Sequence, residues 1–187
     1  MKKTIKNSIF ASLLIGLGVY VLLSTKEPVG AFLFSFGLLT ICILKLKLFT
    51  GMCGYVIENK NYFELSIVCV VNLLSGYIFG YLFSFTNVDL IKIANDKVVI
   101  WGFTPSYFIK SILCGAIMFV AVDLYKNGTK LGILLGIPLF ILCGFQHCVA
   151  NTIIMGIGRT FSATIFICII GNFIGSISAW WLKNDKN

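Results

Sequence analysis

Residues 144–151 read Gly144-Phe145-Gln146-His147-Cys148-Val149-Ala150-Asn151, and they place the only histidine of the chain in the middle of an apolar segment. A titratable side chain at bilayer depth is costly, so it usually faces a cavity and has a function there. The unperturbed pKa of an imidazole, ~6.5, lies close to physiological pH, so His147 can hydrogen-bond or protonate a passing anion. We therefore interpret His147 as a functional group rather than as a histidine that backbone carbonyls satisfy.

The composition around this stretch is that of an integral membrane protein. The chain has 187 residues, of which 58% are hydrophobic and 12% are charged, and its mean hydropathy is +0.97. A soluble domain averages about 25% charged residues. Lysine and arginine near membrane ends normally set topology, so the net charge of +8 does not indicate a nucleic-acid partner.

Six apolar segments predict an all-α integral membrane protein with six transmembrane helices, lying at about 8–24, 29–57, 63–85, 106–124, 130–156 and 160–182. A spanning helix needs ~20 residues, and the second and fifth segments are longer. Both carry polar or small residues in their middle: Lys45, Lys47, Thr50 and Gly51 in one, and Gly144, Gln146, His147 and Asn151 in the other. We predict that these two helices are broken at a protein-lined cavity, where freed backbone groups can be satisfied.

Matched interruptions in two groups of three helices predict an inverted repeat. The chain is then a single transmembrane domain, 1–187, with repeats at about 1–85 and 106–183. The halves open alike, with Ile5-Lys6-Asn7-Ser8-Ile9 and Ile109-Lys110-Ser111-Ile112. Gly76-x-x-x-Gly80 and Gly171-x-x-x-Gly175 mark the third helix of each half as a close-packing face.

Loop charges predict that both termini are cytoplasmic and that the protein lies in the cell membrane. The terminal side carries eight lysines, Lys2, Lys3, Lys6, Lys60, Lys126, Lys130, Lys183 and Lys186, and the other side carries five basic residues, Lys26, Lys92, Lys97, Lys110 and Arg159. The segment at about 86–105 is then external, and its amphipathic pattern is typical of an interfacial segment. The apolar run from Ile9 to Leu23 has no small-x-small cleavage site, so we read it as a retained first helix.

The seven cysteines lie in or beside apolar spans, and their odd number indicates small buried hydrophobes without a disulfide framework. Cys143, His147 and Cys148 would share one turn of a continuous helix, but no second ligand cluster accompanies them. We expect no metal and no cofactor.

Two features beside the first break carry alternatives. Lys45 and Lys47 either snorkel to an interface or, for Lys47 at least, form a positive vestibule that concentrates anions. In Leu48-Phe49-Thr50-Gly51, the Thr50 hydroxyl can line a pore and Gly51 permits a tightly packed backbone. The Leu-Phe-Thr-Gly run alone is usually just core.

Three stretches together resemble the formate/nitrite transporter family. Phe34-Ser35-Phe36-Gly37-Leu38 followed by Leu48-Phe49-Thr50-Gly51 is similar to the second helix and its break, residues 144–151 resemble the family's Gly-Phe-Glu-His-x-Val-Ala-Asn, and Ile169-Ile170-Gly171-Asn172-Phe173-Ile174-Gly175 resembles the last helix. The resemblance implies an aquaporin-like fold, a homopentamer with one pore per protomer, and passage of small monovalent anions such as formate, nitrite or hydrosulfide.

The resemblance also implies pore residues. It places an outer hydrophobic constriction at Phe34 and Phe140, an inner one at Leu38 and Leu48, Thr50 on the central loop, and a proton-exchanging histidine at His147. Asn151 ends the second motif and is included in the pore. Four positions depart from the family pattern: Lys47 replaces an acidic residue, Gln146 a glutamate and Gly115 a fourth-helix asparagine, and the lysine before that helix has only a loose counterpart in Lys97.

The sequence therefore predicts a channel or transporter for small monovalent anions, and not an enzyme, with possible proton transfer by His147. The alternative is an aquaporin-like channel for water or ammonia, in which Val149-Ala150-Asn151 takes the place of an Asn-Pro-Ala motif. An intramembrane enzyme using His147 and Cys148 lacks a second catalytic constellation. A membrane partner that transports nothing is the remaining class.

Overall fold

The computed structural model describes residues 1–25 and 27–185, and every regular element in this part of the chain is helical. Four helices are long and apolar enough to cross a membrane: α1 (Lys2–Ser24), α5 (Tyr62–Phe83), α7 (Pro105–Lys126) and α10 (Thr164–Asn184). At 1.5 Å per residue, the 22 residues of α5 span about 33 Å, close to the ~30 Å of a bilayer core. Two lysines of the charge comparison, Lys26 and Lys186, lie outside the described residues.

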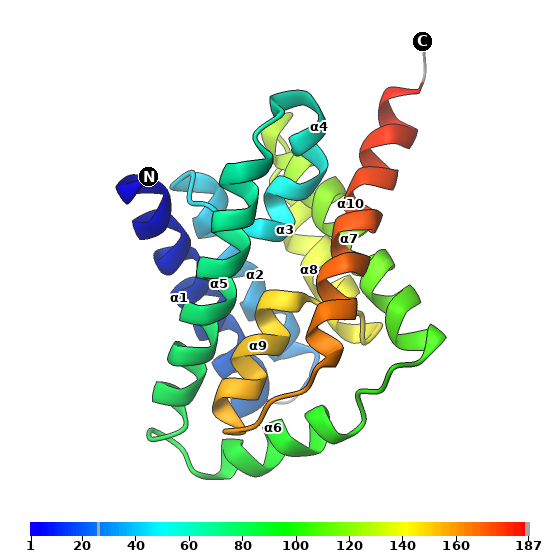
Figure 1. Cartoon of the computed structure of the whole chain (residues 1–187). Helices are drawn as coiled ribbons and strands as arrows, with labels where there is room; N and C mark the ends of the chain where they lie inside the picture. The colour runs from blue at the N-terminus through cyan, green and yellow to red at the C-terminus, as the bar shows by residue number, and fades with distance from the viewer. Residues whose placement is uncertain (26, 186–187) are drawn as a thin grey trace.

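The two long apolar segments are broken helices, as the sequence predicts. The first consists of α2 (Val29–Ile43), a loop over residues 44–48, and the short run of α3 (Phe49–Met52), η1 (Cys53–Tyr55) and α4 (Val56–Asn59). The second consists of α8 (Leu131–Leu142), a loop over 143–147, and α9 (Cys148–Ile157). From the middle of the bundle, α3 and α4 run toward the end that holds both termini, and α9 runs toward the opposite end (Figure 1).

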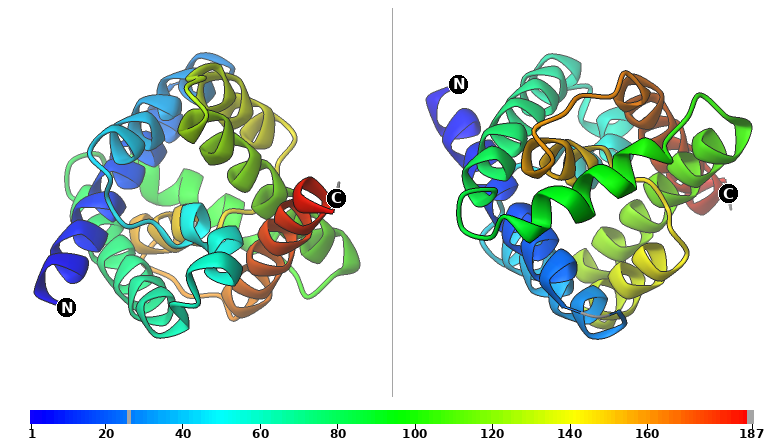
Figure 2. Two further views of the ribbon diagram at one scale, coloured as in Figure 1. Left: turned by 90° about the horizontal axis from the view of Figure 1, so that it is seen from above. Right: turned by 90° about the horizontal axis from the view of Figure 1, so that it is seen from below.

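The two loops turn in the same way. Lys45 and Gly144 both have left-handed backbones, with φ of 53° and 65°. In the next position, the Leu46 N–H donates to the Ile41 carbonyl and the Phe145 N–H to the Phe140 carbonyl, both at 2.9 Å. This shared turn reverses the chain, so that each loop returns to the centre before its second helix begins. A view along the helices shows the long helices surrounding α9 (Figure 2).

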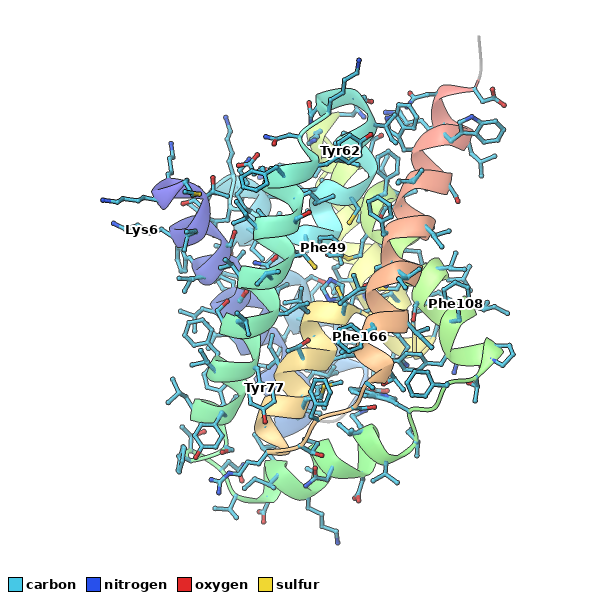
Figure 3. The ribbon with its side chains drawn as sticks, in the orientation of Figure 1. Lys6, Phe49, Tyr62, Tyr77, Phe108 and Phe166 are labelled. Carbon is cyan, nitrogen blue, oxygen red and sulfur yellow. The ribbon has the colours of Figure 1, made fainter. Side chains whose placement is uncertain are left out.

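A buried asparagine on α5 caps the first of the returning helices. The Asn72 side chain accepts a hydrogen bond from the Phe49 N–H at 2.8 Å, and its amide donates to the Ser8 carbonyl at 2.9 Å and the Lys47 carbonyl at 3.2 Å. Helix ends leave N–H groups without partners, and the hydrocarbon layer offers no water to satisfy them. Asn72 therefore permits a helix to begin at this depth, and Figure 3 places Phe49 near the middle of the molecule.

A second asparagine, on α10, makes the matching contacts. The Asn172 side chain accepts from the Cys148 N–H at 2.9 Å and donates to the Ser111 and Gln146 carbonyls, both at 2.8 Å. Ser8 and Ser111, which lie in the two similar openings noted in the sequence, thus each accept from the capping asparagine of their own half.

The glycine pairs of α5 and α10 do not correspond in this way. A Cβ on Gly80 would collide with the Ile153 carbonyl of α9, whereas a Cβ on Gly175 would collide with the Ile112 carbonyl of α7. Each pair does permit close packing of two helices, as expected for small residues in membrane helices. The two pairs thus mark the third helix of each half as a close-packing face, as predicted, although their partner helices, α9 and α7, differ.

A short helix, α6 (Asp89–Val99), lies across the end of the bundle opposite the termini (Figures 1 and 2). Its buried residues recur every fourth position, at Leu90, Ala94 and Val98. This spacing gives one apolar face that packs on the bundle. The segment at 86–105 is therefore amphipathic, as predicted, and its external location stays a prediction.

Candidate functional site

His147 lies where the two broken helices meet. It is the N-cap residue of α9, and its Nδ1 accepts a hydrogen bond from the Ala150 N–H at 3.1 Å. Its Nε2 lies 2.8 Å from the Thr50 hydroxyl of α3. Both side chains are buried, so this pair is a polar contact at the centre of an apolar bundle.

The capping contact assigns the tautomer of the ring. Because Nδ1 accepts the Ala150 N–H, a neutral imidazole carries its proton on Nε2 and donates it to the Thr50 oxygen. The Thr50 hydroxyl then keeps its own proton for another acceptor. A second proton on the ring would go to Nδ1, directly against the Ala150 N–H, so protonation in this orientation requires the cap to break.

Two phenylalanines lie on one side of this pair. Phe34 of α2 and Phe140 of α8 meet edge to face, with ring centroids 6.1 Å apart. Phe140 also stacks on His147, with centroids 5.9 Å apart. Phe34 lies near the start of α2 and Phe140 near the end of α8, so both are on the α6 side of the centre.

Two leucines lie on the other side, where a large cavity begins. Leu38 and Leu48 are almost fully buried, and both line a cavity of about 900 Å³ that opens toward the terminal end. We call this cavity the vestibule. Its other walls come from α3, η1, α4, the start of α5, and the turn between α7 and α8.

Four lysines line the vestibule: Lys45, Lys47, Lys126 and Lys130. Lys45 and Lys47 lie in the loop rather than on a helix, so they share this cavity although two residues apart. Lys47 pairs with Glu64 at 3.4 Å, and the Lys126 ammonium lies 3.0 Å from the centroid of the Tyr55 ring. Lys47 therefore lines the vestibule, and its role in concentrating anions stays a prediction.

Asn151 and Thr50 differ from expectation in position. The Asn151 amide donates to the Tyr107 hydroxyl at 3.0 Å and to Gln146 Oε1 at 2.9 Å, so it holds the second loop in place. Thr50 lies in the first turn of α3 and not on the loop. Asn72 explains this correction, because its side chain caps the Phe49 N–H, so that the helix begins at Phe49 and includes Thr50.

The group of Cys143, His147 and Cys148 does not share a helical turn. The break in the helix separates Cys143, which is exposed, from Cys148, which is buried. The cysteine at 143 is therefore not the buried hydrophobe that the sequence suggested. Among the described residues, no three His, Cys, Asp or Glu side chains are placed to hold a metal ion.

The family model described as Formate/nitrite transporter matches residues 1–177 of the chain. The chain belongs to the formate/nitrite transporter family. It is accordingly a multi-pass membrane protein of a transporter family, as its long apolar helices also indicate.

Two solved structures share this fold. A pentameric formate channel with formate bound has a TM-score of 0.71 and 18% sequence identity, over 97% of this chain and 93% of that chain. An FNT family ion channel has a TM-score of 0.66 and 20% identity, over 95% of this chain and 84% of that one. A comparison with curated proteins found no match.

One departure from the formate/nitrite transporter pattern has a structural reason. A Cβ on Gly115 would collide with the backbone of Asn172, so α7 and α10 pack too closely for an asparagine at position 115. Asn72 and Tyr107 were not singled out from the sequence, and Asn172 appeared only as part of the last-helix motif, without a role. The two asparagines did carry a signal, since polar residues inside apolar spans are costly and usually have a task.

Proposed function

We propose that this member of the formate/nitrite transporter family conducts small monovalent anions of the formate, nitrite or hydrosulfide class. The observation that carries the proposal is the buried His147–Thr50 pair, 2.8 Å apart, with two phenylalanines on one side and two leucines on the other. The lysine-lined vestibule and the formate-bound channel of similar fold support it.

In this proposal the anion passes two apolar constrictions. Phe34 and Phe140 form the outer one, and Leu38 and Leu48 form the inner one. Moving a charge into a low-dielectric site costs several kcal/mol after relaxation. The lysines, Lys47 among them, offset part of this cost by attracting anions from the terminal side. Asn151 acts by holding the loop that presents His147.

At the centre, two hydrogen-bond donors meet the anion. The Thr50 hydroxyl, whose own proton is free, donates to the anion, and the Nε2–H of His147 joins it by turning from the Thr50 oxygen that it contacts at 2.8 Å. Both donors then replace part of the hydration shell, and charge-assisted hydrogen bonds are the stronger ones. If His147 also lends a proton, formate or hydrosulfide crosses the second constriction as a neutral acid. Before it can lend a proton, the neutral ring must gain a second one on Nδ1. To do so, the ring must turn away from the Ala150 N–H, which Nδ1 accepts in this structure.

The finer architecture belongs to the same proposal. We infer one domain of six membrane segments arranged as two inverted repeats, as in aquaporins, from the matching caps by Asn72 and Asn172. Both termini lie at one end of the bundle, and we assign that end to the cytoplasm (Figure 1). We infer a homopentamer with one pore per protomer, in keeping with the pentameric formate channel.

Uptake by proteoliposomes tests the function. Formate, nitrite and hydrosulfide are offered separately at two pH values to the wild type, to His147→Ala, and to Cys143→Ala as a matched control in the same loop. We expect flux of at least one anion that falls or loses its pH dependence in His147→Ala alone. Absence of flux for all three anions, with intact permeation of water or ammonia, would favour the neutral-solute channel instead.

A further inference from the structure

The vestibule is far larger than the proposed permeant ions require. Its volume of about 900 Å³ lies in the range of roughly 300–1,000 Å³ that is typical of sites for metabolite-sized ligands. Formate, nitrite and hydrosulfide have at most three heavy atoms each and would fill a small part of it. Its size therefore suits a larger occupant.

The charges that line the vestibule are strongly unbalanced. Four lysines and one carboxylate, Glu64, face the cavity. Glu64 is already engaged by Lys47 at 3.4 Å and by the Thr4 hydroxyl at 3.0 Å. Lys45 and Lys130 form no ion pair with any residue that the structure describes.

Two carboxylates near Lys126, Glu58 and Asp123, lie outside the cavity wall and restore the balance only in part. Asp123 accepts hydrogen bonds from the Tyr55 hydroxyl at 3.0 Å and from Lys183 at 2.7 Å, and it is not part of the cavity wall. Lys126 itself is held over the Tyr55 ring. The nearby carboxylates therefore offset the positive charge of the cavity only in part, because Lys45 and Lys130 form no ion pair among the described residues, and low-dielectric walls focus the remaining potential.

The lysines come from two separate segments, so they can contact one ligand from two directions. Lys45 lies on the loop after α2, where its left-handed backbone and a 3.2 Å hydrogen bond from its N–H to the Cys42 carbonyl fix its position. Lys126 and Lys130 flank the turn between α7 and α8. Lysine binds phosphoryl groups as a point charge, which suits anions of high charge density.

A highly charged anion in this cavity cannot continue through the pore. Leu38 and Leu48 line the vestibule and are only 1% and 2% exposed, and in the proposed function they form the constriction between it and His147. The cost of desolvating an ion rises steeply with its charge, so these leucines oppose an anion of two or more charges far more than a monovalent one.

We propose that the vestibule is a binding site for an oligovalent oxyanion, an anion with two or more phosphoryl or carboxylate groups, and that this ligand blocks the pore from the terminal side. The binding step stands on the cavity and its lysines alone, whereas the block rests on the proposed function.

Calorimetric titration of the purified full-length protein with pyrophosphate, at fixed ionic strength, tests the binding step. We expect saturable binding with a dissociation constant at least about tenfold lower than that for formate. The double variant Lys45→Gln/Lys130→Gln should weaken it by about tenfold or more. The matched control Lys92→Gln/Lys97→Gln, on α6 at the opposite end, should not change it.

Glu64→Gln gives a test that a folding defect cannot imitate. Removing the one carboxylate of the wall should tighten pyrophosphate binding. Citrate, titrated in parallel, distinguishes a carboxylate ligand from a phosphoryl one, and tight binding of either supports the site. Pyrophosphate and citrate affinities no higher than that of formate, or unchanged in the Lys45/Lys130 variant, would overturn the proposal.

Proteoliposome flux separates this inference from the proposed function. Pyrophosphate on the vestibule side should inhibit anion flux, and pyrophosphate on the α6 side should not. Inhibition that is equal from both sides would overturn the block. If pyrophosphate binds as expected but no anion is conducted, the binding site stands and the proposed function fails.

Discussion

At the scale of single residues, the contact between His147 and Thr50 joins the two halves of the chain at its centre. Thr50→Val keeps the shape of the side chain but removes the acceptor for the Nε2–H, 2.8 Å away. A buried donor left unsatisfied costs about 1–3 kcal/mol. We expect a lower unfolding temperature in detergent and reduced anion uptake, with both retained in Thr50→Ser. Wild-type stability and uptake in Thr50→Val would contradict this role.

The capping role of His147 can be separated from its titration. His147→Asn keeps a side-chain acceptor for the Ala150 N–H but cannot exchange a proton in the range of imidazole, whereas His147→Ala loses both. Removing an N-cap costs about 1 kcal/mol, so His147→Ala should be the less stable of the two.

If the ring lends a proton, wild-type uptake should rise as pH falls, because the imidazolium is populated at low pH. Uptake by both variants should then be flat with pH once the transmembrane pH gradient is clamped. An unchanged pH profile in His147→Asn would remove the proton relay and leave His147 as a hydrogen-bond donor.

Lys47 and Glu64 form a charge pair whose members should act on flux with opposite signs. Lys47→Gln lowers the positive potential of the vestibule, and Glu64→Gln raises it. We expect anion uptake at low ionic strength to fall by several-fold in the first variant and to rise in the second, and both effects to fade near 0.5 M salt, where the Debye length is only a few ångströms. Changes of the same sign would show that the pair acts on stability and not on the local anion concentration.

At the scale of elements, the two broken helices depend on buried asparagines that lie outside them. Asn72→Ala and Asn172→Ala each remove the acceptor for a helix N–H and the donor to two backbone carbonyls. We expect each to lower stability by a few kcal/mol, measured as unfolding in detergent or by loss of folded protein.

Asn72→Asp and Asn172→Asp are the matched variants, because an acid keeps the acceptor and loses the amide donor. We expect them to fall between alanine and the wild type when the acid is neutral. Alanine variants as stable as the wild type would show that the helix starts are satisfied without the asparagines.

The elements differ in how far the sequence foretold them. Apolar runs predicted the membrane segments, and polar residues within two of them predicted the breaks, because such residues are costly in lipid. The exact start of α3 was not predicted, because the Asn72 side chain caps the Phe49 N–H and so places Thr50 in the first turn of the helix. Asn72 is 22 residues from Thr50 in the sequence. The glycine pairs correctly predicted close packing of α5 and α10, but such a motif does not name the partner helix.

The same limit applies to the site. Phe34, Phe140 and His147 lie in contact, and Leu38 and Leu48 line the vestibule, while the constrictions that the resemblance implied stay predictions. The polar partners that hold the loops beside these residues come from distant helices. One example is the Tyr107 hydroxyl of α7, which accepts a hydrogen bond from the Asn151 amide of α9. A single sequence carries no record of such pairings, so they emerge only from the fold.

At the scale of the whole molecule, much apolar surface remains uncovered. In each of the four long helices, only 28% to 50% of an 18-residue apolar stretch is buried inside the protomer. Large side chains such as Phe36, Phe63 and Phe166 are more than half exposed. This surface suits lipid and neighbouring protomers, because neither requires polar groups.

The proposed pentamer makes two measurable claims. Native mass spectrometry from a mild detergent should give an assembly five times the 20.7 kDa of the protomer, and a monomer under the same conditions would contradict it. Because the His147–Thr50 pair lies wholly within one chain, each protomer should conduct by itself. Pentamers assembled from mixed wild-type and His147→Ala chains should then lose flux in linear proportion to the mutant fraction. A steeper loss, in which one mutant chain silences its neighbours, would place the conduction path between protomers instead of inside them.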